Sequence, residues 1–119
     1  MSQIPIIPDA TEEALKQRHA AYTSREPAVD LADLAIRLAT AIRLRDEAEA
    51  GYRVFRAEFG ARLRAEDPKL AEWKAKEACD ASPEFQAWKK ALANGEAWVA
   101  FFGALADSRR IAGGLGRTA

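Results

Sequence analysis

The chain has 119 residues, of which 49% are hydrophobic and 30% charged, a composition that excludes an intrinsically disordered chain. Its 18 basic and 18 acidic residues give a formal net charge of zero, which argues against a dedicated binder of duplex DNA. A single cysteine, Cys79, excludes an intrachain disulfide. The longest apolar run, near residues 97–106, is too short to cross a bilayer, and residues 1–8 do not resemble a signal peptide. We therefore expect one soluble, cytoplasmic domain.

The fold class follows from the long runs of alanine, leucine, glutamate, lysine and arginine, which favour helix. We expect an all-α protein built as a long antiparallel helical hairpin or bundle with short capping helices. Residues 1–8 precede it as an extended arm, because two prolines disfavour helix there. The apolar residues of this arm should lie on a neighbouring surface, which we take to be the protein's own domain in preference to a second subunit. They are Ile4, Ile6 and Ile7.

The first helix is expected over residues 10–23, where Asp9 and Glu12 resemble a capping box. It carries His19, the only histidine of the chain. With neither a cysteine nor a carboxylate at ligand spacing, His19 is interpreted as a surface or packing residue and not as a catalytic one.

The dominant feature is a second helix that begins near Asp30 and ends before Pro68. Apolar residues recur there at spacings of three and four over more than four heptads, a pattern typical of a coiled coil that needs an antiparallel partner helix. Gly51 and Gly60 weaken this helix, and either could mark a bend. Arg45 interrupts the apolar pattern, and we interpret it as an arginine whose charged end reaches solvent; a buried residue that sets the register is the alternative.

Two prolines predict the later helices. Asp67 before Pro68 and Ser82 before Pro83 each place a capping residue ahead of a proline. These signals predict helices over 68–81 and 83–111. Asn94-Gly95 could end the last helix early, but the apolar pattern stays in phase across it, which favours one long helix. The helical domain thus covers residues 9–112, and residues 113–119 form a flexible tail.

We identify no catalytic, cofactor-binding or metal site. Cys79 and His19 are too few for a zinc site, and Cys79 is interpreted as a small packed residue. Asp46, Glu47 and Glu49 form an acidic cluster, but arginines at i+4 spacing surround it, which favours surface ion pairs. The sequence therefore indicates a protein that is not an enzyme.

The stretch 96–106 is apolar over an unusually wide arc, so either it is central in the bundle or a partner covers its second side. We predict a partner interface here, although the first helix and the arm could cover the same surface. Gly103 would let another backbone approach closely. The predicted interface residues are Trp98, Phe101, Phe102 and Leu105.

A second set of residues could contact nucleic acid through stacked aromatic rings and cations. Tryptophans at helical spacing are more often core, however, and basic residues at a helix C-terminus also complement its dipole. The set is Trp88, Lys89, Lys90, Arg109 and Arg110, with the pair Trp73 and Lys74 as a further candidate.

The Tyr52–Phe59 stretch, the Trp73–Lys76 segment and the ending Leu105–Arg110 together resemble small helical accessory proteins of phages and prophages. The resemblance covers about residues 45–112. It implies a protein encoded near recombination or replication genes, and small phage inhibitors of host defence share the same plain helical pattern.

From the sequence we expect a non-enzymatic adaptor that acts through an unidentified protein partner and as a homo-oligomer, without a membrane. The alternatives are a single-stranded nucleic-acid-binding mediator of recombination or replication and an inhibitor that occludes a host defence protein.

Overall fold

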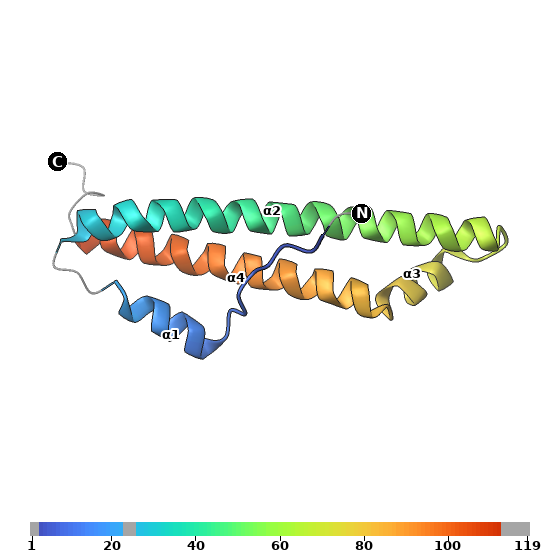
Figure 1. The fold of residues 1–119 in the computed structure, drawn as a ribbon, viewed down its shortest axis with the longest axis horizontal. Coiled ribbons are helices and arrows are strands. Elements are labelled where there is room, and N and C mark those ends of the chain that lie inside the picture. Colours follow the sequence, from blue (N-terminus) through green and yellow to red (C-terminus); the bar gives the residue numbers. More distant parts are fainter. Residues whose placement is uncertain (1–2, 23–25, 113–119) are drawn as a thin grey trace.

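The computed structural model describes residues 3–22 and 26–112. In this part of the chain the helices are α1 (Glu12–Ala20), α2 (Pro27–Glu66), α3 (Glu72–Asp80) and α4 (Pro83–Ala112). Figure 1 shows α2 and α4 side by side and antiparallel, with α3 at the connection between them and α1 beside the other half of α4. The molecule measures 64 × 31 × 22 Å. The predicted all-α hairpin with short capping helices is confirmed; the predicted tail, residues 113–119, lies outside the described residues.

The hairpin is held together by large side chains of α4 packed on small side chains of α2. Four aromatic residues of α4 are buried, whereas the buried face of α2 consists largely of alanine, glycine and Leu34. Such a face lets the two helix axes come close and still fills the space between them. The buried aromatic residues of α4 are Phe85, Trp88, Trp98 and Phe102.

Two glycines mark the closest contacts between the long helices. A Cβ atom on Gly51 would lie 2.2 Å from the ring of Trp88, and one on Gly95 would lie 3.0 Å from the Cα of Arg45. Both glycines therefore make room for the opposite helix. Gly51 does not bend or end α2, which is a single helix over its whole length. The remaining part of Arg45 reaches the surface, where its guanidinium pairs with Asp46 at 3.0 Å, as predicted.

Helix α4 passes through Asn94-Gly95 without a break, which confirms the longer of the two predicted helices. Asn94 has a different role from a helix cap. Its amide oxygen accepts a hydrogen bond from the backbone N–H of Ala10 at 3.1 Å, and its amide nitrogen donates one to Asp9 at 3.2 Å. The residue therefore fastens the N-terminal arm to the middle of α4.

The arm packs on its own domain, as expected. The indole Nε1 of Trp98 donates a 2.8 Å hydrogen bond to the carbonyl of Pro8, and Ile7 packs against the hydrophobic core. The expectation that all three isoleucines pack is wrong for Ile6, which is exposed, because its side chain points away from that of its neighbour Ile7 on the extended backbone.

Several predicted helix boundaries need correction. Thr11, not Asp9, caps α1, since its hydroxyl accepts from the backbone N–H of Ala14, while Asp9 is engaged with Asn94. The helix is accordingly shorter than predicted. The Asp67 carboxylate accepts from the N–H of Lys69 and closes a turn, so α3 begins at Glu72 and not at Pro68.

At the end of the hairpin opposite α3, a charged contact joins the two long helices. Arg109 of α4 lies 3.0 Å from Asp30 of α2, and both side chains are largely buried.

Within the described part of the chain, none of the helices combines the length and apolarity needed to cross a membrane.

The glycine contacts predict opposite outcomes for two alanine substitutions. Gly51→Ala should lower the free energy of unfolding by about 1–3 kcal/mol, because the new methyl group overlaps the Trp88 ring and the core must shift. Gly60→Ala is the matched control: its Cβ meets nothing within 4 Å, so helix propensity alone should raise stability by about 0.5–1 kcal/mol. Urea unfolding followed by circular dichroism measures both, and equal stabilisation by the two variants would contradict the close contact.

Candidate binding surfaces

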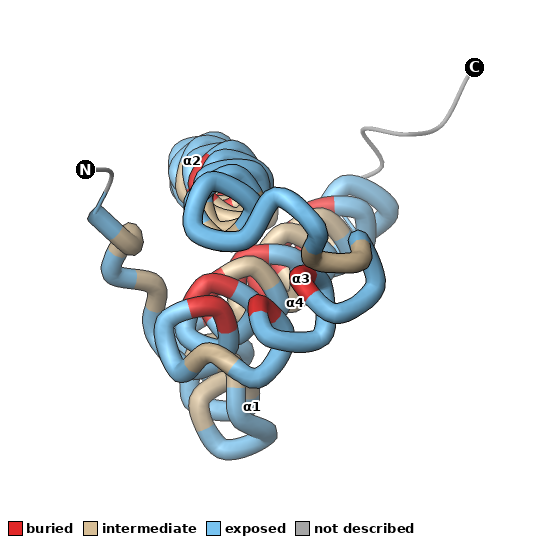
Figure 2. The backbone as a smooth tube through the Cα atoms, turned by 90° about the vertical axis from the view of Figure 1, so that its right-hand side faces the viewer, coloured by how far each residue is buried: buried red, intermediate tan, exposed pale blue. Residues whose placement is uncertain are grey.

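The predicted partner interface on α4 is covered by the chain itself. Trp98, Phe102 and Leu105 are buried, and Phe101 is half-buried. The rings of Trp98 and Phe102 stack with their centroids 5.5 Å apart. The end-on view shows α4 between α2 on one side and α1 on the other (Figure 2). The wide apolar arc of α4 is therefore explained by its central position, the alternative that the sequence left open.

Gly103 does not provide the close backbone contact that its position suggested. A Cβ atom there would meet nothing within 4 Å.

The structure does not assemble the residues considered for nucleic acid into one site. Trp88 is buried against Gly51 and has no face left for a base. Lys90 lies near Asp9 at 3.6 Å, Arg110 pairs with Asp107, and Arg109 pairs with Asp30. Lys89 and the two arginines are also separated by about 30 Å of helix at 1.5 Å per residue.

Trp73 is not a core residue, contrary to the expectation for tryptophans at helical spacing. Its side chain is 63% exposed, and the ammonium of Lys74 lies 5.5 Å from its ring. The short helix α3 buries Ala75 and Cys79 against the hairpin, and Trp73 points away from that face. Periodicity could not reveal this, because α3 begins four residues later than the proline signal suggested.

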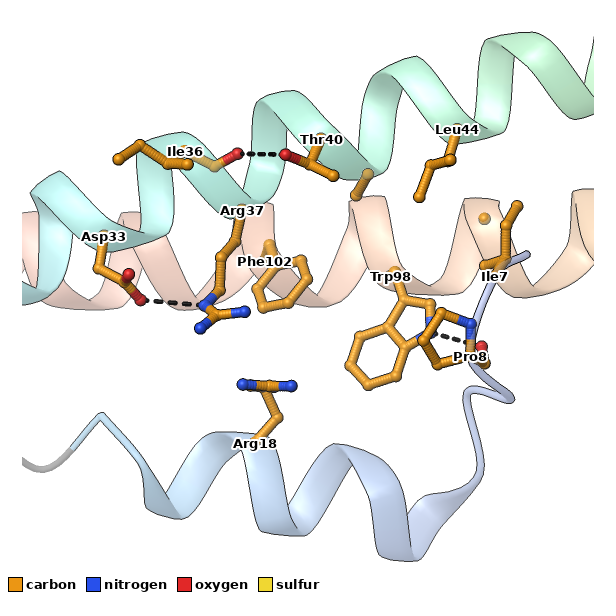
Figure 3. Close-up of a pocket in the computed structure, with 12 residues that line it drawn as sticks. Ile7, Pro8, Arg18, Asp33, Ile36, Arg37, Thr40, Leu44, Trp98 and Phe102 are labelled. Carbon is orange, nitrogen blue, oxygen red and sulfur yellow. Dashed lines mark hydrogen bonds and ion pairs between the residues drawn. The ribbon is translucent and has the colours of Figure 1, made fainter. Parts of the chain in front are cut away.

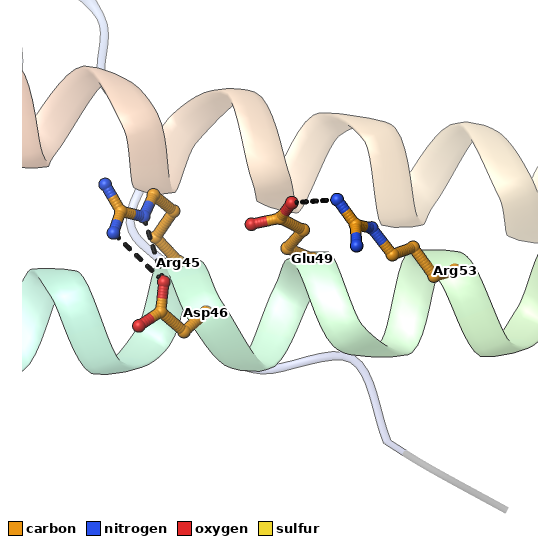
Figure 4. Close-up of polar contacts among 4 residues, drawn as sticks. All are labelled: Arg45, Asp46, Glu49 and Arg53. Carbon is orange, nitrogen blue, oxygen red and sulfur yellow. Dashed lines mark hydrogen bonds and ion pairs between the residues drawn. The ribbon is translucent and has the colours of Figure 1, made fainter.

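The acidic cluster on α2 is a set of surface ion pairs, as predicted (Figure 4). Arg53 donates to Glu49 at 2.7 Å, and Arg43 pairs with Glu47 at 2.9 Å. His19 is exposed on α1. Cys79 is buried as expected, and this burial raises the pKa of its thiol. Among residues 3–22 and 26–112, no three His, Cys, Asp or Glu side chains are placed to hold a metal ion.

A cavity of about 430 Å³ lies between α2, α4, α1 and the arm. Its walls are mostly apolar, and the charged groups among its lining residues are Arg18, Asp33 and Arg37 (Figure 3). The apolar lining consists of Ile7, Pro8, Ile36, Ala41, Leu44, Trp98 and Phe102. This cavity could not be predicted from the sequence, because its walls come from four segments that are distant in the chain.

The charged groups at the cavity form a connected cluster. The hydroxyl of Tyr22 and the Nε of Arg37 both donate to the Asp33 carboxylate. These two hydrogen bonds, with that from Tyr22 the stronger cause, lower the pKa of Asp33 below its ordinary 3.8. Burial, and then the contact with Asp33, raises the pKa of Tyr22. The guanidinium of Arg18 comes from α1 and faces that of Arg37 (Figure 3).

The second surface is the outer side of α2, away from α4. Val29, Ile36 and Val54 are 56%, 69% and 47% exposed. At about 100° per residue these three positions lie within about 20° of one another around the helix. Exposed alanines flank them, and together these apolar residues span about 48 Å at 1.5 Å per residue, with the ion pair of Arg43 and Glu47 on the same face at the middle. We call this band the outer stripe; it comprises Val29, Ala32, Ile36, Ala39, Ala50, Val54, Ala57 and Ala61.

Comparison with models of known protein families, with curated proteins and with solved structures gives no match to this chain.

The Tyr22–Asp33 hydrogen bond predicts a pH-dependent effect of Tyr22→Phe. The depressed pKa of Asp33 contributes stability that is present above the unfolded-state pKa and is lost as the pH falls through the folded-state pKa. Tyr22→Phe removes the largest cause of that depression. The difference in unfolding free energy between wild type and variant should therefore be largest at neutral pH and shrink below about pH 4. Urea titrations across this range test it, and a difference independent of pH would contradict the assignment.

Proposed function

We propose that the protein is a non-enzymatic helical accessory protein that self-associates through the outer stripe of α2 and acts by binding another protein. The observation that supports this most directly is the alignment of Val29, Ile36 and Val54 on one exposed line of α2. Single exposed apolar residues are common on protein surfaces, whereas exposed apolar residues aligned along one face of a helix are typical of a helix–helix interface.

The architecture explains why this band remains uncovered. Along most of its length the hairpin is only two helices thick, so α2 has one face against α4 and its opposite face toward solvent (Figure 2). The arm and α1 cover α4 and leave the outer stripe exposed. A second long helix laid on this stripe would bury it in the manner of a helical bundle.

The stripe is also complementary to itself. In an antiparallel pairing of two α2 helices with a two-fold axis level with Arg45, Ile36 lies opposite the partner's Val54. In the same register Arg43 lies opposite the partner's Glu47, and the axis repeats both contacts. Such a pairing matches apolar with apolar and positive with negative, as a two-fold symmetric interface requires. A second copy of this chain is therefore the partner that we propose for the stripe.

The resemblance to small phage accessory proteins supports an origin in a phage or another mobile element, with action in the cytoplasm. The single-strand-binding alternative has less support, because Trp88 is buried and the cations proposed with it are dispersed. The arm covers the aromatic face of α4. This favours a role for that face in the core of the chain over a role as a partner surface. The protein partner would then meet a surface presented by the assembled dimer.

A charge placed in the stripe tests the proposal. Val54→Asp should weaken self-association by at least about tenfold, because the carboxylate would be buried opposite Ile36 without a partner. Ile111→Asp is the matched control: Ile111 is 67% exposed near the end of α4 and lies outside the stripe, so its variant should associate like wild type. Sedimentation equilibrium over the micromolar range measures both. A wild-type chain that stays monomeric throughout this range would refute the proposal.

A charge exchange tests the register within the same proposal. Arg43→Glu places two acids opposite each other at two symmetric positions and should weaken the dimer. Adding Glu47→Arg restores opposite charges in the antiparallel register and should recover association. If the double variant associates no better than Arg43→Glu alone, this register is wrong even where the stripe itself is the interface.

A further inference from the structure

The cavity between α1, α2, α4 and the arm has the size and composition of a small-molecule site. Its volume of about 430 Å³ falls within the range of 300–1,000 Å³ usual for such sites. The indole of Trp98 and the ring of Phe102 form part of its wall, with Leu44 and Ile36 on the α2 side. Trp98 and Phe102 also belong to the core between the two helices, so an apolar group of a ligand would lie against the part of each ring that faces the cavity.

The charged groups of the cavity lie together at the end away from the arm and carry a net positive charge (Figure 3). Figure 3 shows Arg18 and Arg37 with their guanidinium groups facing each other, and Asp33 beside Arg37. The cavity thus holds two guanidinium groups and one carboxylate, and only Arg37 contacts that carboxylate. Arg37 donates its Nε to Asp33 and also interacts with the Tyr22 hydroxyl, so the remaining N–H groups of its five-donor fork are those that could reach a ligand. This end of the cavity therefore has two positive charges and only one negative charge.

The side chain of Arg18 gives the strongest reason to expect an anionic group in the ligand. No hydrogen bond or ion pair joins its side chain to another described residue, although it is half-buried and close enough to lower the pKa of Asp33. Half-buried arginines usually donate to a carboxylate or phosphate, since the guanidinium carries five donors in a planar fork.

We propose that this cavity binds a single-chain amphiphile with a carboxylate head, that is, a fatty acid. The carboxylate would lie between Arg18 and Arg37, and the hydrocarbon chain would extend over Trp98 and Phe102. Each methylene group that leaves water favours binding, and the paired guanidinium groups fix the direction of the chain. A monoanion suits the site better than a dianionic phosphate head, because the Asp33 carboxylate already lies beside Arg37 and would repel the second charge.

Three probes with the same hydrocarbon chain, and dodecyl phosphate as a fourth, test the proposal on the wild-type protein by titration calorimetry below their micelle concentrations or solubility limits. Dodecanoate should bind with one molecule per chain. Dodecanol should bind about tenfold more weakly, because it cannot form charge-assisted hydrogen bonds with the arginines. Dodecyltrimethylammonium should not bind measurably. Equal binding of all three, or no binding of dodecanoate, would overturn the proposal, and tighter binding of dodecyl phosphate than of dodecanoate would replace the carboxylate head with a phosphate.

A pair of variants on α1 locates the head group. Arg18→Gln should weaken the binding of dodecanoate about tenfold, while it leaves the fold intact because the side chain of Arg18 forms no hydrogen bond or ion pair with another described residue. Lys16→Gln is the matched control: it removes the same charge from the same helix at an exposed residue that does not line the cavity. Equal dodecanoate affinity of the two variants would contradict the assignment of Arg18.

The proposal does not depend on self-association. Ile36 belongs both to the cavity wall and to the outer stripe, so the titration is repeated on Val54→Asp, whose substitution lies outside the cavity lining. Dodecanoate should bind this variant as tightly as wild type. Loss of binding in Val54→Asp would instead mean that the site requires the dimer, and the cavity as a site within one chain would be refuted.

Discussion

The close contact of α2 with α4 is the constraint on which the rest of the structure depends. Trp88 fits only because Gly51 has no side chain, and the backbone of Arg45 approaches α4 only because of Gly95. Two such contacts, six residues apart on α2, fix both the distance and the register of the helices. Because α2 contributes mostly small residues to this contact, one narrow face is enough to hold α4. Its opposite face remains available for another helix.

The same register positions the polar contacts that complete the fold. It places Asp30 against Arg109 at the open end of the hairpin, where a buried ion pair disfavours any other alignment of the helices. It also presents Asn94 at the middle of α4, where its side chain holds the arm and α1 follows from Thr11. The cavity exists because α1 is held away from α2 by this route, with Arg18 and Arg37 facing each other across it (Figure 3).

The helices could be predicted from sequence because their signals are local. Apolar spacing predicted α2 and α4, and Ser82 before Pro83 marked the start of α4 correctly. The misassigned starts of α1 and α3 have a common cause: Asp9 and Asp67 are capping residues by type, but each uses its side chain in another contact.

Contacts between distant segments could not be predicted in this way. Trp98 looked like a partner anchor because nothing in the sequence connects its indole with the carbonyl of Pro8. The cavity requires four segments at once, and its arginines have no spacing that would identify them. The outer stripe was hard to recognise in the sequence, because Ile36 and Val54 are separated by 18 residues and align on one face only when α2 is a single unbroken helix.

We propose that two copies of the chain pair antiparallel through the outer side of α2, and distances between spin labels test this pairing most directly. In a chain whose buried Cys79 is replaced by alanine, single labels are attached at residue 28 or at residue 62, which flank the stripe. Both lie 17 residues from the proposed axis, so pulsed electron resonance should give the same separation for each, about 51 Å along the helices. Short separations for both labels would mean a parallel pairing, and the absence of any dipolar signal would mean that the stripe does not join two copies.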